Sequence, residues 1–419
     1  MKQNSETFCH FPFSTIWVGG SGLMNPCCEA LLHNAKEYQI PNQSMNEYWN
    51  SKELGNLRSD LLNNKKNSAC NHCWREETQG MTSKRLQQDP STRENTDVIN
   101  PKVHAISLQL TNLCNLGCRM CHHWASSVIE DENREHHNLY HSNKYKIADD
   151  LDWHHSESQF KELDQQRNWW ANEEFLQDIH NTLPNVYYMD VSGGEPTLNK
   201  TFISILDRCI EINHARNMHL EITTNAQQIN PKLLERLHHF RHVNIFVSVD
   251  GYKDVYEYIR WKGSWNKLEK NIIWLKENAN NNISIICHQT SQVLNILNLP
   301  DLLDWYQQNN INWTNINAVT RPNHHNILVL PKHIRNIAQQ KWQSFLEKYQ
   351  PSLHPQQEMN TINIIKSLET TDQNYERKWW KYFVRDTMIK DEIRKQSLEK
   401  SVPELYNLIK EDYRLENET

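Results

Sequence analysis

The sequence lacks any run of about 18 consecutive apolar residues, the length that a membrane-spanning helix needs. Its first residues also lack the apolar core of a secretory signal peptide. We therefore expect no membrane association and predict a cytoplasmic location. Long basic runs are absent too, and the net charge is -6, so a nucleic-acid partner is not expected.

Hydrophobic residues are also scarce, at 37% of the chain. A disordered chain is nevertheless not expected, because 15 Trp, 15 Tyr and 10 Phe supply large side chains for a core. With 419 residues, the chain is long enough for two or three packed units.

Ten cysteines are present, and several are clustered. In a long chain without a secretory signal, clustered cysteines bind metals more often than they form disulfides. Cys114, Cys118 and Cys121 have the spacing C-x3-C-x2-C, just after a strand-like segment. Three thiolates suit a [4Fe–4S] cube with one iron left open for a substrate. The alternative is a fragment of a zinc site, with His122 or His123 as the fourth ligand.

Three regions can be distinguished along the chain: residues 1–100, residues 101–330, and a helical region at 331–419. The middle region alternates strand-like and helix-like segments, which predicts an α/β fold with parallel strands. Strands are expected at 106–110, 186–192, 219–225, 243–251, 283–290 and 312–317, and helices at 199–216, 231–240, 265–279 and 299–310. In such sheets, ligands bind at the carboxyl ends of the strands.

The second strand of this region runs into Gly193, Gly194, Glu195 and Pro196. Together with the three-cysteine motif, this segment resembles the radical S-adenosylmethionine (SAM) superfamily. The resemblance implies a partial (β/α)6 TIM-type barrel and a Gly-Gly-Glu-Pro segment that binds the amino group of SAM. It also implies reductive cleavage of SAM to a 5′-deoxyadenosyl radical that abstracts hydrogen from a substrate. An electron donor such as flavodoxin or ferredoxin is then needed.

Further SAM contacts are implied by the same resemblance. Met120 has the position whose side chain packs near the adenine, and Arg260 that of the arginine that pairs with the SAM carboxylate. The remaining polar residues at strand ends match positions that contact the ribose or carboxylate, or recur at the rim: Thr223, Asn225, Ser248, Asp250 and Asn295. The alternative for each polar residue at a strand end is a helix cap.

Residues 1–100 carry a second set of cysteines. Cys9, Cys27, Cys70 and Cys73, with Gly22 before Cys27, resemble the twitch domain, a shortened SPASM domain. The resemblance implies one auxiliary [4Fe–4S] cluster, although such a domain usually follows the barrel. Cys28 is adjacent to Cys27, and the glycine spacing favours Cys27 as the ligand. A zinc ribbon at the same four cysteines remains open, because spacing does not distinguish the two metals.

The resemblance implies an enzyme that oxidises or crosslinks a peptide or protein side chain. One alternative is a radical SAM dehydrogenase or mutase that acts on a small molecule or carbohydrate. The other is a non-catalytic, zinc-stabilised binding protein without affinity for SAM. A polar insertion at 125–180 is interpreted as a lid or a solvated excursion.

Overall fold

The computed structural model describes residues 5–32, 35–78, 82–87, 96–140, 142, 168–370 and 372–418. Residues 141 and 143–167 of the polar insertion predicted at 125–180 therefore lie outside the described residues.

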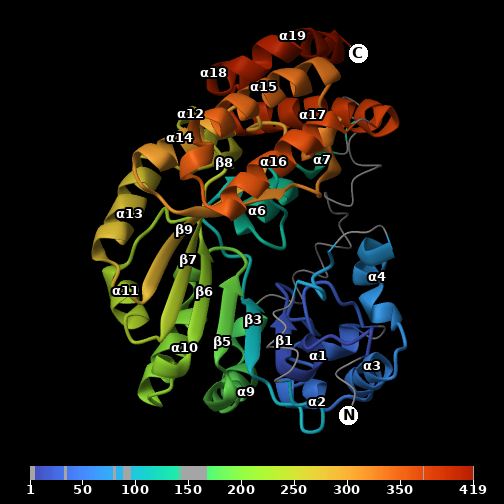
Figure 1. Ribbon diagram of the computed structural model, residues 1–419, viewed down its shortest axis with the longest axis vertical. Helices are drawn as coiled ribbons and strands as arrows, with labels where there is room; N and C mark the ends of the chain where they lie inside the picture. Colours follow the sequence, from blue (N-terminus) through green and yellow to red (C-terminus); the bar gives the residue numbers. More distant parts are fainter. Residues whose placement is uncertain are drawn as a thin grey trace.

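The centre of the molecule is an eight-stranded sheet in the order β10-β9-β7-β6-β5-β3-β1-β2 (Figure 1). All strand pairs are parallel except β1 with β2. The six strands expected in the middle region are β3 (Ala105–Gln109), β5 (Tyr188–Ser192), β6 (His219–Thr224), β7 (His242–Ser248), β9 (Ile283–Ser291) and β10 (Trp313–Ala318). The expected α/β architecture with a mostly parallel sheet is thus present, and the sheet is open at β10 and β2.

The two faces of the sheet differ in polarity. Residues such as Val191 and Leu220 are fully buried, as expected for a face that is covered by helices. The alternate residues are partly exposed, and one row of them is polar across four neighbouring strands: Ser107, Asp190, Glu221 and Asn244 are paired in register. We call this partly exposed, polar face the inner face, and it offers polar groups to a ligand.

Helices connect the parallel strands, as the alternating pattern predicts. They are α10 (Lys200–Glu211), α11 (Pro231–Leu237), α12 (Asp254–Ile259), α13 (Trp265–Asn278) and α14 (Leu299–Gln308). Capping residues fix where two of them begin. The Asn199 side chain accepts hydrogen bonds from the first turn of α10, and Asn230 caps α11, which begins with Pro231.

The N-terminal region joins the sheet directly. Strand β1 (Thr15–Val18) pairs in parallel with β3, and β2 (Met24–Asn25) forms the edge. Helices α1 (Phe11–Ser14), α2 (Met45–Trp49), α3 (Lys52–Leu62) and α4 (Asn71–Thr78) pack beside this edge (Figure 1). We call residues 5–87 the N-terminal unit.

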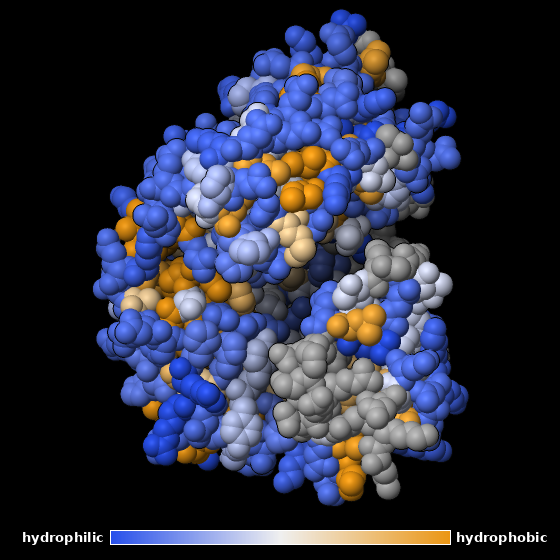
Figure 2. Space-filling model, in the orientation of Figure 1, coloured by the Kyte–Doolittle hydropathy of each residue, from blue (hydrophilic) through white to orange (hydrophobic). Residues whose placement is uncertain are grey.

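The last part of the chain is helical, with α15 (Lys332–Tyr349), α16 (Pro355–Glu369), α17 (Gln373–Arg394), α18 (Leu398–Ser401) and α19 (Pro403–Glu418). These helices lie above the carboxyl ends of the strands. Figure 2 shows a hollow between them and the N-terminal unit. Within the described part of the chain, the helices are all too short or too polar to cross a membrane.

Candidate active site

The three-cysteine motif forms a loop at the carboxyl end of β3. Within it, β4 (Gly117–Cys118) pairs antiparallel with β8 (Arg260–Trp261). A side chain at Gly117 would place its Cβ 2.7 Å from the ring of Trp261, so the pairing requires glycine there. The loop is followed by α6 (Ser127–Glu135) and α7 (His137–Tyr140). We call residues 114–121 the cysteine loop.

The three thiols of the loop line one cavity of about 490 Å³. Burial, followed by repulsion from Cys118, raises the pKa of the Cys114 thiol to about 12. The pKa of Cys121 is raised by burial and then by repulsion from the other two sulfurs, and burial raises that of Cys118. Three buried thiols that repel one another in this way become stable thiolates only when a cation is bound between them.

The spacing of the sulfurs bears on which metal group fits. Zinc with bonds of about 2.3 Å to sulfur would hold its ligands about 3.8 Å apart. Among the described residues, no three cysteine sulfurs lie within 4.8 Å of one another. The loop therefore fits a larger cluster better than a single ion.

The double glycine after β5 approaches this loop closely. Gly193 and Gly194 have φ angles of 81° and 56°. A Cβ at Gly194 would lie 2.5 Å from the carbonyl oxygen of Leu113, and one at Gly193 2.9 Å from the Cβ of Gln109. Both positions therefore need glycine, and the turn exposes backbone polar groups to the cavity.

Glu195 is fully enclosed behind this turn. Its carboxylate accepts hydrogen bonds of 2.7 Å from the hydroxyl of Thr224, the backbone N–H of Asn225 and the hydroxyl of Thr197. Burial raises the pKa of Glu195 against the opposing effect of these donors. These hydrogen bonds link the segment of the glycine turn to the end of β6.

Arg260 joins the cavity to a buried carboxylate. Its Nη2 lies 2.6 Å and its Nε 2.9 Å from Oδ2 of Asp250, and its Nη1 lies 3.7 Å from the sulfur of Cys118. Burial alone would lower the pKa of Arg260, but Asp250 and then Cys118 outweigh it and raise that pKa. Asn295 supports the pair, because its Nδ2 donates to the carbonyl oxygens of Asp250 and Thr290.

Ten of the predicted site residues line this cavity together: Cys114, Cys118, Met120, Cys121, Gly193, Gly194, Thr223, Asn225, Ser248 and Arg260. Four others do not line it: Glu195, Pro196, Asp250 and Asn295. The cavity also contains His122, which was considered only as a zinc ligand, and four residues that were not predicted: Leu116, Ala125, Thr224 and Arg321. Arg321 comes shortly after β10, so the same rule about strand ends would have found it.

The four cysteines predicted to form the N-terminal set also lie near one another. Burial and then repulsion from Cys9 and Cys73 raise the pKa of Cys70 to about 12. The pKa of Cys27 is raised by burial and then by Cys9, with a smaller contribution from Cys70. Cys28 is exposed instead, and its sulfur lies 3.0 Å from Nζ of Lys84.

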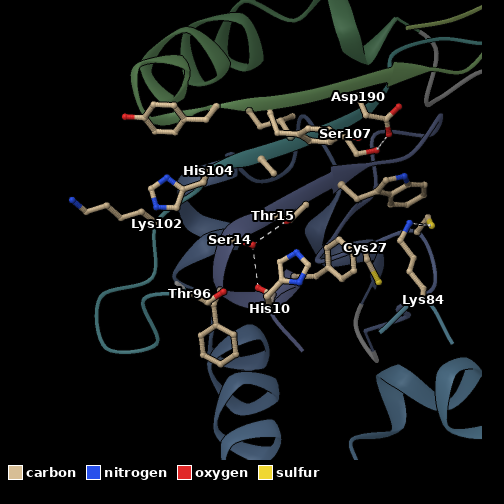
Figure 3. Close-up of a pocket in the computed structure, with 18 of the residues that line it drawn as sticks. His10, Ser14, Thr15, Cys27, Lys84, Thr96, Lys102, His104, Ser107 and Asp190 are labelled. Atoms are coloured by element: carbon tan, nitrogen blue, oxygen red, sulfur yellow. Dashed lines mark hydrogen bonds between the residues drawn. The ribbon is translucent and has the colours of Figure 1, made fainter. Parts of the chain in front are cut away.

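A second cavity of about 780 Å³ lies between the N-terminal unit and the first residues of the parallel strands. Figure 3 shows that Cys27 and Lys84 reach it from the N-terminal unit, and Ser107 and Asp190 from β3 and β5. The Ser107 hydroxyl donates to Asp190 over 2.6 Å. Burial raises the pKa of Asp190, partly offset by that hydrogen bond.

Comparison with known proteins agrees with this geometry. The family model described as the radical SAM superfamily matches residues 108–299, which include the cysteine loop, the glycine turn and Arg260. This part of the chain is therefore a radical SAM domain, and the members of that superfamily are enzymes.

Among curated proteins, the chain is similar to mycofactocin maturase MftC of Mycolicibacterium smegmatis, with 29% identity over 82 residues. The match covers 19% of this chain and a fifth, 20%, of that relative's length.

Two solved structures are more distant. One is native anSMEcpe with bound AdoMet and the Cp18Cys peptide, at 12% identity and a TM-score of 0.38, covering 60% of this chain and 62% of that one. The other is Streptococcus suis SuiB bound to the precursor peptide SuiA, at 12% identity and a TM-score of 0.35, covering 67% and 60%.

Proposed function

We propose that the chain is a radical SAM enzyme whose Cys114, Cys118 and Cys121 hold a [4Fe–4S] cluster with an open iron for SAM. When bound, the cluster and SAM supply a 5′-deoxyadenosyl radical that abstracts hydrogen from the substrate. The observation that carries this proposal is that the three thiols and the double-glycine turn line one cavity at the carboxyl ends of the strands. The sulfur spacing disfavours the zinc-stabilised binding protein.

The surrounding residues have separate tasks in this proposal. Gly193 and Gly194 offer backbone groups to the amino group of SAM, and Met120 packs near the adenine. The Arg260 guanidinium beside Cys118 stabilises the negative charge on that sulfur, and Asp250 holds the guanidinium in place. The Nδ2 of Asn225, 3.9 Å from the Cys114 sulfur, offers a further weak donor.

For the N-terminal unit, we propose an auxiliary [4Fe–4S] cluster on Cys9, Cys27, Cys70 and Cys73. Its support is the mutual repulsion of these thiols together with sulfur separations too large for one zinc ion. Four cysteine ligands leave no iron open, which suits electron transfer better than substrate activation. A flavodoxin or ferredoxin is the proposed external electron donor.

The proposed substrate is a peptide or protein side chain. The cavity of about 780 Å³ beside Cys27 offers room for a side chain, and the polar row of the sheet begins there with Ser107 and Asp190 and runs across the strands to β7. The name of the relative from M. smegmatis, a maturase, agrees with this choice. Oxidation or crosslinking of the side chain is the proposed outcome.

Anaerobic quantitation of iron and sulfide, combined with a dithionite-dependent assay for 5′-deoxyadenosine, tests this function. About eight irons per chain and formation of 5′-deoxyadenosine are expected. Zinc in place of iron, with no cleavage of SAM, would contradict the proposal and favour the binding protein.

A further inference from the structure

A buried lysine of the C-terminal helix α17 contacts the backbone of the cysteine loop. The Nζ of Lys390 donates to the carbonyl oxygen of Arg119, over 3.0 Å, and lies 2.8 Å from Oδ2 of Asp386. Arg119 stands between Cys118 and Met120 in the chain. Lys390 and Asp386 are both buried, with 4% and 1% of their side chains exposed. The ion pair within α17 is therefore directly attached to the loop.

A second branch leads from the same carboxylate to the side chain of Met120. The Nε2 of His325 lies 3.4 Å from Oδ2 of Asp386, and its Nδ1 lies 3.0 Å from Oε1 of Gln292. The amide nitrogen of Gln292 donates to the sulfur of Met120 at 3.5 Å. His325 and Gln292 are fully buried, whereas Met120 lines the cavity.

The same helix also holds the flanks of the loop. Arg394 at the end of α17 donates to both carboxylate oxygens of Glu132, over 2.7 and 3.0 Å. Glu132 belongs to α6, which follows the loop. The Arg119 side chain in turn pairs with Asp391 of α17. Helix α17 therefore contacts the loop and the segment that follows it.

From these contacts, we propose that Asp386 and Lys390 are positioning residues for SAM binding, which they support by holding the Arg119 carbonyl and, through His325 and Gln292, the Met120 side chain. This inference rests on the proposed function. Its physical basis is that methionine has three rotatable bonds, so an unsupported Met120 would lose part of its binding free energy to ordering.

A metal site is the rival interpretation of this cluster, because ligand atoms of His324, His325 and Asp386 lie within 4.8 Å of one another. The ammonium group of Lys390 already neutralises Asp386 there. A divalent cation would add an uncompensated charge at a fully buried position, which is costly. The observed contacts therefore favour an ion-paired network.

The test uses the reconstituted holoenzyme and a double variant, Asp386→Leu with Lys390→Met, which removes both charges and nearly preserves volume. We expect the KM for SAM in dithionite-driven cleavage to rise about five- to tenfold, with the maximal rate changed less than about twofold. If that variant does not fold, Gln292→Met leaves the Asp386–Lys390 pair in place and removes the bonds of the Gln292 amide to Met120 and to His325. The same shift in KM is expected.

A matched control is Arg335→Met with Glu376→Leu. Arg335 is 3% exposed and pairs with Glu376 of α17 at 3.2 Å, far along the helix from the contacts with the loop. This control should lower the melting temperature and leave the KM for SAM unchanged.

Three results would overturn the inference: an unchanged KM in the first variant, an equal rise in the control, or one bound divalent metal that the first variant loses. Absence of SAM cleavage in the unsubstituted enzyme would instead contradict the proposed function itself.

Discussion

The two sets of cysteines differ in how the chain brings them together. The thiols of the cysteine loop come from residues 114–121, whereas those of the N-terminal unit come from segments between residues 9 and 73. The loop is shaped locally, by the pairing of β4 with β8. The N-terminal set comes from separate places in the chain: Cys9 precedes α1, Cys27 follows β2, Cys70 directly precedes α4 and Cys73 lies within it.

Their surroundings differ as well. The loop faces a cavity that also contains the glycine turn and the guanidinium of Arg260. The N-terminal set stands beside the larger cavity, where the Nζ of Lys84 lies 3.0 Å from the sulfur of Cys28 and its charge also interacts with Cys27. The set of three thiols thus shares its cavity with a glycine turn and a guanidinium, whereas Cys27 of the set of four lines a cavity that also contains Lys84. If the two sets have different functions, substitutions in them should have different effects.

The largest effect is expected at the cysteine loop. Cys114→Ala should reduce SAM cleavage more than about 100-fold, because the cluster loses one of the three thiols that line this cavity. The assay is formation of 5′-deoxyadenosine with dithionite. Cys209→Ala, in the buried face of α10, is the matched control and should keep its activity. Cleavage that persists in Cys114→Ala would show that the two sets are misassigned.

The N-terminal set should respond differently. Cys70→Ala should lower the iron content from about eight to about four per chain and abolish product formation from substrate, while uncoupled cleavage of SAM changes less than about threefold. Iron analysis and the same cleavage assay check this. Cys28→Ala should leave eight irons; a loss of iron in that variant would make Cys28 the ligand instead of Cys27.

A smaller effect is expected at Arg260. Lysine cannot make both of the bonds to Asp250 that lie at 2.6 and 2.9 Å, so Arg260→Lys should raise the KM for SAM about tenfold. The control is Arg236→Lys, since Arg236 forms a similar two-bond pair with Asp207 on the exposed helices. An equal rise of the KM for SAM in both variants would contradict a specific role for the Arg260–Asp250 pair beside Cys118.

The smallest effect is expected in the pH dependence of folding stability, to which the buried His324 and His325 contribute. Burial lowers the pKa of His324 and lowers that of His325 to about 3, despite the opposing effect of Asp386. The unfolded chain therefore binds more protons below pH 6.5, and folding stability is lost as the pH falls from there toward 3. The neutral imidazole of His325 should cost about 1 kcal/mol per pH unit in that window, and that of His324 adds a loss in the same direction.

Thermal melting between pH 7 and pH 5 measures this loss. His324→Leu should make the melting temperature less dependent on pH, because one buried imidazole is removed. A pH dependence identical to that of the unsubstituted protein would contradict the assignment of a neutral, buried His324.

Much of the fold follows from the sequence because strands and the helices between them have different periodicities. The expected strands and helices of the middle region are present, often with ends shifted by one or two residues. Strand β1 was not expected, because its four residues, Thr15–Val18, are too few to show a pattern. Its place beside β3 depends on pairing with a strand about 90 residues later.

Within the candidate site, residues at strand ends were easier to predict than the directions of their side chains. The carboxyl ends of parallel strands meet at one edge, so the cysteine loop, the glycine turn and Thr223 come together. Glu195, Asp250 and Asn295 stand at the same ends but bind neighbouring groups of the chain. Which way such a side chain points depends on its tertiary partners.

The sequence by itself determined the spacing of the thiols, the positions that only glycine can occupy and the order of strands and helices, since these depend on residues close together in the chain. The tertiary structure alone decided that Lys390 of α17 binds the carbonyl of Arg119, 271 residues earlier. Hydrogen bonds and ion pairs over such separations form only when the core has packed, so no local sequence pattern predicts them.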